Sequence, residues 1–355
     1  MRDVLHAVVA GALEAAVRAG ELPAPPPLTF SVGPPRQARF GDLACDVALV
    51  LGAALGRSPS VTAATLMRYV CDPGGWFEAV EVGGPGYVNF RLAPAFWQAQ
   101  VARVFDRTGP TGDAGAGCVV GPDPVPEPDV TWGRAVAVAT AVRRLLPRSS
   151  GGDPRPVWVA LPGARGAAAR AACRAAGARL VGVGEARVVR RGTPVIMDLA
   201  ALEAAVGADA ARFFLVGAPV DTALEVDADV AAQRAMESPY FAVRWAEVRC
   251  ARVVGGGVPG SVADLTGLGA PDVPLARVLA EWPDVRADVA TTLEVHRLGA
   301  FAIALAAAFH GYYNRRPIVT DDVRRDRARV ALVQGVGRVL RDALDLLGVG
   351  AIGEA

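Results

Sequence analysis

Lysine is absent from the sequence, so all 37 of its basic residues are arginines. A Walker-type lysine, a Schiff-base lysine and a lysine-bearing catalytic loop are therefore excluded. The 36 acidic residues leave a formal net charge of only +1. Because nucleic-acid-binding proteins usually carry an excess of basic residues, this balance counts against RNA binding, although a local cluster of arginines would not show in the sum.

Histidine and cysteine are scarce as well. The three histidines and five scattered cysteines form no C-x-x-C pair, so we expect no metal site and interpret the cysteines as reduced thiols of a cytoplasmic protein. No apolar run reaches the roughly 18 residues that a membrane span needs. Charged residues interrupt the amphipathic segment at positions 1–20, so no signal peptide is expected. The composition thus predicts a cytoplasmic protein with no membrane anchor, and no cofactor is predicted.

The pattern along the chain predicts three parts and an α/β plus all-α fold class. Residues 1–107 have the mixed helix and strand pattern of an α/β unit, and a glycine-rich linker follows at 108–117. Residues 117–235 alternate strand and helix, which is typical of a small parallel sheet. Long amphipathic helices occupy residues 236–355, which predicts a helical bundle.

The second long helix of this bundle carries the clearest periodic pattern. Leu298, Phe301, Leu305 and Phe309 recur at three- and four-residue steps, which places them on one face. Polar and aromatic residues gather at its end, between positions 310 and 316. Arginine and aromatic side chains presented together suit stacking on unpaired bases and pairing with phosphates. A bundle with a solvated polar rim is the alternative interpretation.

These helices resemble the α-helical, DALR-type anticodon-binding domain of arginyl-tRNA synthetases. The family's Pro-Val-Tyr-Tyr-Val-Gln-Tyr-Ala-His-Ala-Arg is similar to Pro239–Arg249, and its Pro-His-Arg-Leu to Val295–Leu298. Its Ala-Phe-His-x-Phe-Tyr-Asn is similar to Ala308–Asn314. The family's terminal Pro-Glu-x-Met is not found at residues 350–355, which puts specificity for an arginine anticodon in doubt. The resemblance implies RNA contacts at Arg244, Arg249, Arg252, His296, His310, Tyr312, Tyr313, Arg315 and Arg316.

The first part resembles the N-terminal additional domain of the same family. Phe40–Ala48 is similar to the family's Tyr-Gly-Asp-Tyr-x-Thr-Asn-Val-Ala, and Gly84–Phe90 to its Gly-Pro-Gly-Phe-Ile-Asn-Phe. The resemblance implies a contact with the D-loop elbow of tRNA, in which Tyr87 stacks and Asn89 forms hydrogen bonds. Alternatively, the Gly-Pro-Gly run is a hairpin turn with Tyr87 as its packing anchor. Asp46 replaces the family's asparagine, and an exposed carboxylate there would repel phosphate.

The middle part resembles a reduced, Rossmann-like class I catalytic domain with degenerate signatures. The family's first signature segment aligns on Val120–Arg134, and its His-x-Gly-His falls on Asp129, Val130, Thr131 and Trp132. A carboxylate in place of an imidazole inverts the electrostatics that phosphoryl chemistry needs. The second signature resembles Val188–Leu199, where Arg190 and Arg191 occur without the mobile lysine. We therefore expect that the chain is not an enzyme and that aminoacylation is absent.

Three functions remain open on these patterns. The favoured hypothesis is a catalytically inactive, truncated relative of arginyl-tRNA synthetase that binds tRNA or tRNA-like RNA at both ends. It would act as an adaptor or regulator with a partner such as a tRNA-modifying enzyme. A protein–protein scaffold without RNA binding is the second hypothesis. The third is an enzyme of altered nucleotide or amino-acid chemistry, with Asp129 and Thr131 as a metal or hydroxyl site and Arg190 with Arg191 as an anion clamp.

Overall fold

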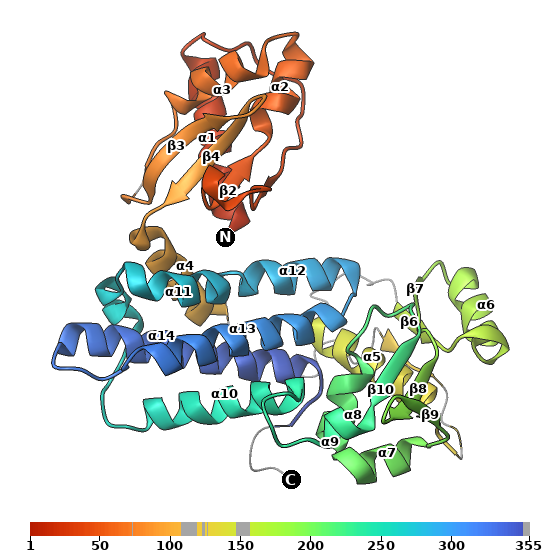
Figure 1. Cartoon of the computed structure of the whole chain (residues 1–355). Coiled ribbons are helices and arrows are strands. Elements are labelled where there is room, and N and C mark those ends of the chain that lie inside the picture. The colour runs from red at the N-terminus through yellow and green to blue at the C-terminus, as the bar shows by residue number, and fades with distance from the viewer. Residues whose placement is uncertain (73, 108–118, 123–124, 126, 147–156, 351–355) are drawn as a thin grey trace. The chain divides into compact units, whose positions relative to one another are not determined.

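The computed structural model describes residues 1–72, 74–107, 119–122, 125, 127–146 and 157–350 (Figure 1). Two compact units make up the chain, Met1–Arg103 with Leu265–Ala280 and Val104–Asp264 with Glu281–Ala355. The three-part division at 1–107, 117–235 and 236–355 stays a prediction. The predicted linker at 108–117 and the chain end at 351–355 lie outside the described residues.

An antiparallel sheet forms the centre of the first unit, with strand order β1-β2-β4-β3. Helix α1 buries Leu5, Val9, Ala12 and Ala16, which recur at steps of three and four residues and so share one face. The elements of this unit are α1 (Arg2–Arg18), β1 (Val32–Gly33), η1 (Ala38–Phe40), β2 (Leu43–Cys45), α2 (Val47–Leu55), α3 (Pro59–Met67), β3 (Phe77–Gly83), β4 (Tyr87–Leu92), η4 (Ala270–Asp272) and α11 (Val273–Ala280), together with most of α4 (Pro94–Arg107).

The Gly-Pro-Gly run forms the turn of the β3–β4 hairpin. Gly86 has a φ of 136°, a conformation that other residues rarely adopt. A Cβ at Gly86 would also lie 2.7 Å from the Cβ of Pro59 at the start of α3. The turn therefore needs glycine both for its backbone angle and for its close packing on α3.

A segment from late in the chain completes the first unit. Gln98 in α4 donates a hydrogen bond of 2.8 Å to the carbonyl of Leu268. Arg277 of α11 pairs with Asp42 and lies 5.0 Å from the ring centre of Trp97. Asp42 also accepts a 2.8 Å bond from the backbone N–H of Leu92, so this carboxylate joins α11 to strand β4.

Two small sheets and their helices form the α/β part of the second unit. Strands β5, β6 and β7 pair in parallel, and β8 pairs in parallel with β10 and antiparallel with β9. This arrangement confirms the predicted fold class of a parallel-sheet core with a helical C-terminal region. The elements are β5 (Val119–Val120), α5 (Val130–Leu145), β6 (Val157–Ala160), η2 (Gly163–Gly166), α6 (Ala167–Ala175), β7 (Arg179–Gly182), β8 (Ala186–Arg190), β9 (Thr193–Val195), α7 (Leu199–Val206), α8 (Ala208–Leu215), β10 (Leu224–Asp227) and α9 (Ala228–Ala232).

Arg134 ties helix α5 to the loops around the second sheet. Its guanidinium is fully buried and donates to the carbonyls of Thr222 at 2.5 Å, Pro219 at 2.7 Å and Gly184 at 3.2 Å. Burial lowers the pKa of Arg134, and the nearby charge of Asp221 acts in the opposite direction. Because one buried guanidinium donates to carbonyls of two loops, this arginine holds the loops in place.

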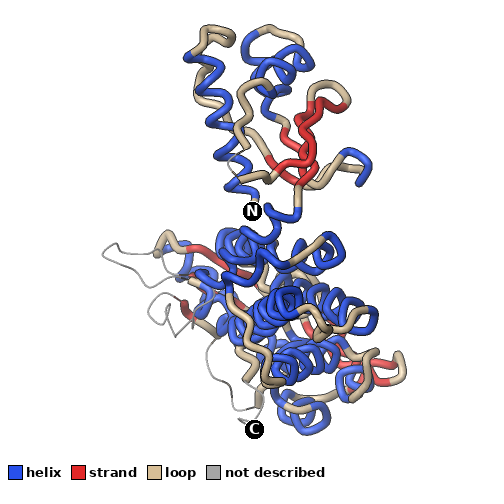
Figure 2. Tube along the Cα trace, turned by 90° about the vertical axis from the view of Figure 1, so that its left-hand side faces the viewer, coloured by secondary structure: helices blue, strands red, loops and turns tan. Residues whose placement is uncertain are grey.

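A helical bundle forms the rest of the second unit (Figures 1 and 2). Helices α10, α13 and α14 pack on one another, and Leu298, Phe301, Leu305 and Phe309 are buried as the periodicity predicts. No helix in the described ranges is long and apolar enough to cross a membrane. The bundle elements are α10 (Pro239–Val254), η3 (Val262–Gly267, whose last residues belong to the first unit), α12 (Trp282–Thr292), α13 (His296–Arg315) and α14 (Val323–Leu346).

Candidate nucleic-acid interface

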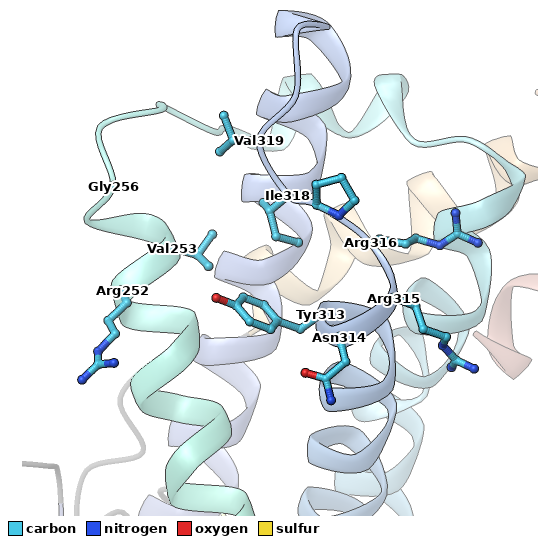
Figure 3. A pocket seen from close by; sticks show the side chains of 10 residues that line it. Arg252, Val253, Gly256, Tyr313, Asn314, Arg315, Arg316, Ile318 and Val319 are labelled. Atoms are coloured by element: carbon cyan, nitrogen blue, oxygen red, sulfur yellow. The ribbon is translucent and has the colours of Figure 1, made fainter.

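The ends of α10 and α13 and the segment that follows α13 enclose a pocket of about 570 Å³. Figure 3 shows the ring of Tyr313 in its middle, with Arg252 on one side and Arg315 and Arg316 on the other. None of the ten lining residues carries a carboxylate. We call this site the bundle pocket, and its lining residues are Arg252, Val253, Gly256, Tyr313, Asn314, Arg315, Arg316, Pro317, Ile318 and Val319.

Arginine and aromatic side chains stack beside the bundle pocket. The guanidinium of Arg249 lies 5.3 Å from the ring centre of Trp245 and 5.1 Å from that of Tyr313. The guanidinium of Arg252 lies 5.5 Å from the ring centre of Trp245. The ring of Phe241 stacks on Trp245, with 6.2 Å between the ring centres. Each such cation–π contact contributes about 0.5–1 kcal/mol at an exposed site. The stack therefore keeps positive charge and flat rings together at the pocket edge.

His310 lies behind this stack and inside the bundle. One of its nitrogens, Nε2, is 2.9 Å from the carbonyl of Ala242, and Nδ1 is 3.4 Å from the guanidinium of Arg249. Arg249 also donates to the side-chain oxygen of Asn314 at 3.4 Å. The pKa of His310 lies below its usual value, mainly because burial disfavours the charged ring. The hydrogen bond to Ala242 acts to raise this pKa, and the charge of Arg249 acts to lower it.

The structure brings together some of the predicted RNA contacts and separates others. Arg249, Arg252, Tyr313, Arg315 and Arg316 meet at the bundle pocket or beside it. His310 and Tyr312 are each only 6% exposed, so their side chains lie within the bundle rather than on its surface. A role in binding for either residue would have to act through its neighbours.

Arg244 and His296 lie away from the bundle pocket. The guanidinium of Arg244 is 3.0 Å from the carboxylate of Glu247, a buried group that Arg341 also approaches to 3.3 Å. His296 begins α13, whereas the pocket lies at the end of this 20-residue helix, about 30 Å along its axis. Arg244 is a structural partner here, and direct RNA contacts of both residues stay predictions.

A second hollow of about 580 Å³ lies in the first unit, next to the β3–β4 turn. Tyr87 lines it and is 38% exposed, whereas the neighbouring Asn89 is only 6% exposed. The Asp46 carboxylate also lines the hollow, but it accepts a 2.6 Å bond from the backbone N–H of Ser31. Phe40 is an exposed ring in this hollow that was not among the predicted contacts, although it directly precedes the Gly-Asp pair of the first motif.

Two residues of the first signature segment, Asp129 and Thr131, line a third pocket of about 730 Å³. Asp129 caps α5 by accepting a 2.8 Å bond from the N–H of Trp132, and its carboxylate is 2.7 Å from Arg165. Burial acts to raise the pKa of Asp129, but the bonds from Arg165 and from backbone N–H groups hold it below its usual value. We call this site the sheet pocket, lined by Asp129, Thr131, Pro162, Arg165, Glu185, Ala186, Arg187, Ala218, Ala223, Leu224 and Glu225.

Both arginines of the sheet pocket are paired with acids. Arg187 pairs with Glu225 across β8 and β10, as Arg165 pairs with Asp129. The hydroxyl of Thr131 exchanges hydrogen bonds of 3.0 and 3.2 Å with the backbone of Ala186, so it has a structural role. No group of three or more His, Cys, Asp or Glu side chains that could hold a metal occurs among the described residues.

The second signature segment meets the first at its C-terminal end. The backbones of Asp129 and Asp198 form an isolated bridge, and Leu199 packs so closely on Gly133 that a Cβ there would lie 2.6 Å from it. Arg190 and Arg191 do not line the sheet pocket. Asp229 of α9 binds both, through the Arg190 side chain at 3.3 Å and the Arg191 backbone N–H at 2.7 Å.

Comparison with known proteins agrees with the motifs at both ends. The arginyl tRNA synthetase N terminal domain matches residues 3–92, and the DALR anticodon binding domain matches residues 268–354. The arginine–tRNA ligase of Desulfosudis oleivorans is 34% identical over 182 residues, which cover 46% of this chain and 33% of the relative. Both ends of this chain thus match domains of the arginyl-tRNA synthetase family. The arginine–tRNA ligase of Symbiobacterium thermophilum is 38% identical over 170 residues, which cover 46% of this chain and 30% of the relative.

Solved structures of the arginyl-tRNA synthetase family show the same fold. The Thermus thermophilus enzyme aligns with a TM-score of 0.72 at 15% identity, over 99% of both chains. The Plasmodium falciparum enzyme aligns with a TM-score of 0.70 at 8% identity, over 100% of this chain and 99% of the other. In sequence, the matches to the curated ligases span only about a third of their length.

One sequence-based prediction is wrong. We expected that the chain is not an enzyme, because both signature motifs are degenerate. The relatives it matches are named as ligases, and its fold is that of arginyl-tRNA synthetases, so the family points to an enzyme. The match to an anticodon binding domain supports a tRNA-related function.

Proposed function

We propose that this member of the arginyl-tRNA synthetase family binds tRNA, and that the bundle pocket takes unpaired nucleotides of the anticodon loop. One observation carries the proposal. The pocket surrounds Tyr313 with Arg252, Arg315 and Arg316, and none of its lining residues carries a negative charge. Phosphates and unpaired bases are the ligand groups that such a combination recognises.

The physical chemistry of the bundle pocket suits a single-stranded loop. Stacking of a base on an aromatic side chain contributes about 1–3 kcal/mol to binding, whichever base it is. Tyr313 is 37% exposed and can offer one such face. If each of three arginines meets one phosphate, the slope of the logarithm of the binding constant against the logarithm of the salt concentration is roughly −2. The overall charge of +1 adds little attraction, so binding depends on this local cluster.

The hollow in the first unit supports a second contact, with a base of the tRNA elbow. Tyr87 and Phe40 offer exposed rings there, and the small Pro34 and Pro35 lie beside them. The Asp46 carboxylate repels phosphate, so a neutral base of the RNA suits the hollow better than the RNA's phosphate backbone does. Asn89 is buried, so stacking on Tyr87 carries this contact rather than hydrogen bonds from Asn89.

The names of the relatives point to the same ligand. They are called arginine–tRNA ligases, and tRNA is the partner in that name whose chemistry matches the two hollows. An adaptor role, in which the chain presents its bound tRNA to a tRNA-modifying enzyme, extends this proposal. Recovery of the same protein partner only when tRNA is present would support the adaptor role.

The test is binding of purified full-length chain to total tRNA across a salt series from about 50 to 200 mM, with the bound fraction sequenced. We expect salt-dependent binding that is enriched for particular tRNAs and weakened by Tyr313→Ala and by Arg316→Ala. Arg174→Ala, at an exposed arginine of α6, is the matched control and should bind normally. Absence of binding at the lowest salt would overturn the proposal and favour a protein partner instead.

A further inference from the structure

We propose that His310 is a positioning residue, which fixes the guanidinium of Arg249 between the rings of Trp245 and Tyr313 before RNA arrives. This inference rests on the proposed function of the bundle pocket and adds a residue that does not itself touch RNA. Arg249 meets Trp245, Tyr313, Asn314 and His310, so its position is defined from four directions.

The partners of the imidazole dictate its protonation. The carbonyl of Ala242 can only accept a hydrogen bond, so Nε2 of His310, 2.9 Å away, must carry the proton. The guanidinium of Arg249 can only donate, so Nδ1 must present its lone pair to it. Both contacts are satisfied by one form of the ring alone, the neutral Nε2–H tautomer.

This geometry makes His310 a link between two helices. The ring projects from α13, and both of its nitrogens meet groups of α10, Ala242 and Arg249. Arg249 then returns to α13 through Asn314, at 3.4 Å. A side chain held in this way has few rotamers before binding, so it loses little conformational entropy when RNA binds. This is how preorganisation strengthens an interface.

A buried histidine that only fills space is the simpler interpretation, and one substitution separates the two. Glutamine carries a carboxamide N–H that can donate to the Ala242 carbonyl and an oxygen that can accept from Arg249. His310→Gln therefore keeps the donor and acceptor pattern without the ring. A space-filling role predicts that glutamine and alanine both fail, whereas positioning predicts that glutamine restores function.

The first test needs no RNA. The chain has three histidines, so a nitrogen-detected NMR spectrum of ¹⁵N-histidine-labelled protein contains the ring-nitrogen signals of only three imidazoles, two for each. His310→Gln identifies the two ring-nitrogen signals of residue 310 by their disappearance. We expect the neutral Nε2–H tautomer at neutral pH, with Nδ1 shifted by its contact with Arg249. An Nδ1–H tautomer or a charged ring at neutral pH would overturn the inference.

The second test is tRNA binding by the full chain and its variants. His310→Ala should weaken binding about tenfold, similar to Arg249→Ala, because a side chain must then be ordered during binding. The double variant should bind no more weakly than Arg249→Ala, since His310 acts through Arg249. His310→Gln should bind within about twofold of the wild type. His6→Ala, in the first unit, is the matched control.

The outcomes separate the two proposals. If the wild type binds tRNA and Tyr313→Ala weakens it, but His310→Ala binds normally, only the role of His310 is overturned. Failure of His310→Gln to restore binding, in a protein with the wild-type melting temperature, also overturns it. If the wild type binds no tRNA, the proposed function fails and this inference fails with it.

Discussion

The bundle pocket and the sheet pocket both collect arginines, but their arginines have different neighbours. In the bundle pocket, Arg252 lies against an aromatic ring and no lining residue is acidic. In the sheet pocket, Arg165 and Arg187 each pair with a carboxylate. A paired guanidinium has already used much of its attraction for anions, whereas one that rests on a ring keeps its charge available. The neighbours of an arginine therefore decide what it can bind.

The largest expected effect concerns the protein interior beneath the sheet pocket. Arg134→Met should lower the free energy of unfolding by about 3–5 kcal/mol, because the carbonyls of Gly184, Pro219 and Thr222 lose the fully buried donor that they share. Chemical denaturation measures this change, and Arg174→Met is the matched surface control, with an effect within about 0.5 kcal/mol. An Arg134→Met protein as stable as the control would contradict the structural role of this guanidinium.

Removal of the central ring of the bundle pocket should have the next largest effect. Tyr313→Ala should cost about 1–3 kcal/mol of tRNA binding, because a base loses its stacking partner. Tyr313→Phe keeps the ring and should bind nearly as well as the wild type. Titration of labelled tRNA measures both variants, and equal losses for Ala and Phe would mean that the hydroxyl, not stacking, matters.

A pair of arginine variants compares the two pockets directly. Arg316→Ala should reduce the slope of log K against log salt by about 0.7, because one phosphate contact is lost. Arg165→Ala should leave the slope unchanged, since Asp129 occupies that guanidinium. A change of slope for Arg165→Ala, but not for Arg316→Ala, would reverse the assignment of the RNA-binding pocket.

The smallest effect tests the ion pair of the sheet pocket. The pKa of Asp129 is lower in the folded protein than its usual value near 4, so the ionised carboxylate stabilises the fold above that pH. This stability is lost as the pH falls through the folded pKa. Asp129→Asn keeps the helix cap but not the ion pair, and should remove at most about 1 kcal/mol, because the pair is half exposed.

The check for this last prediction is thermal unfolding of both proteins from about pH 6 down to pH 3, across the usual titration range of carboxyl groups. The difference in stability should narrow as the pH falls. A difference that stays constant with pH would show that ionisation of Asp129 does not stabilise the fold.

Much of the fold followed from local patterns, because they reflect properties of one segment. The stripe from Leu298 to Phe309 predicted a buried helix face, and the Gly-Pro-Gly run predicted a hairpin turn. Both signals depend on residues within a few positions of one another. The match of both chain ends to the arginyl-tRNA synthetase family then confirmed the fold class.

Partner choice between distant side chains could not be predicted. Arg165 meets Asp129 from 36 residues away, and Asp229 binds the turn at Arg190 from 39 residues away. The end of α13 shows the same limit, since helical spacing alone did not separate the buried His310 from the exposed Tyr313. These contacts depend on how helices and sheets pack, which one sequence leaves open.

The most direct measurement is photocrosslinking of tRNA that carries photoreactive bases in its anticodon loop, with the linked peptides identified by mass spectrometry. We expect crosslinks to the ends of α10 and α13, within residues 245–254 and 309–319, and their loss in Tyr313→Ala. Crosslinks to the sheet pocket around Asp129 and Arg165, with none at Tyr313, would contradict it.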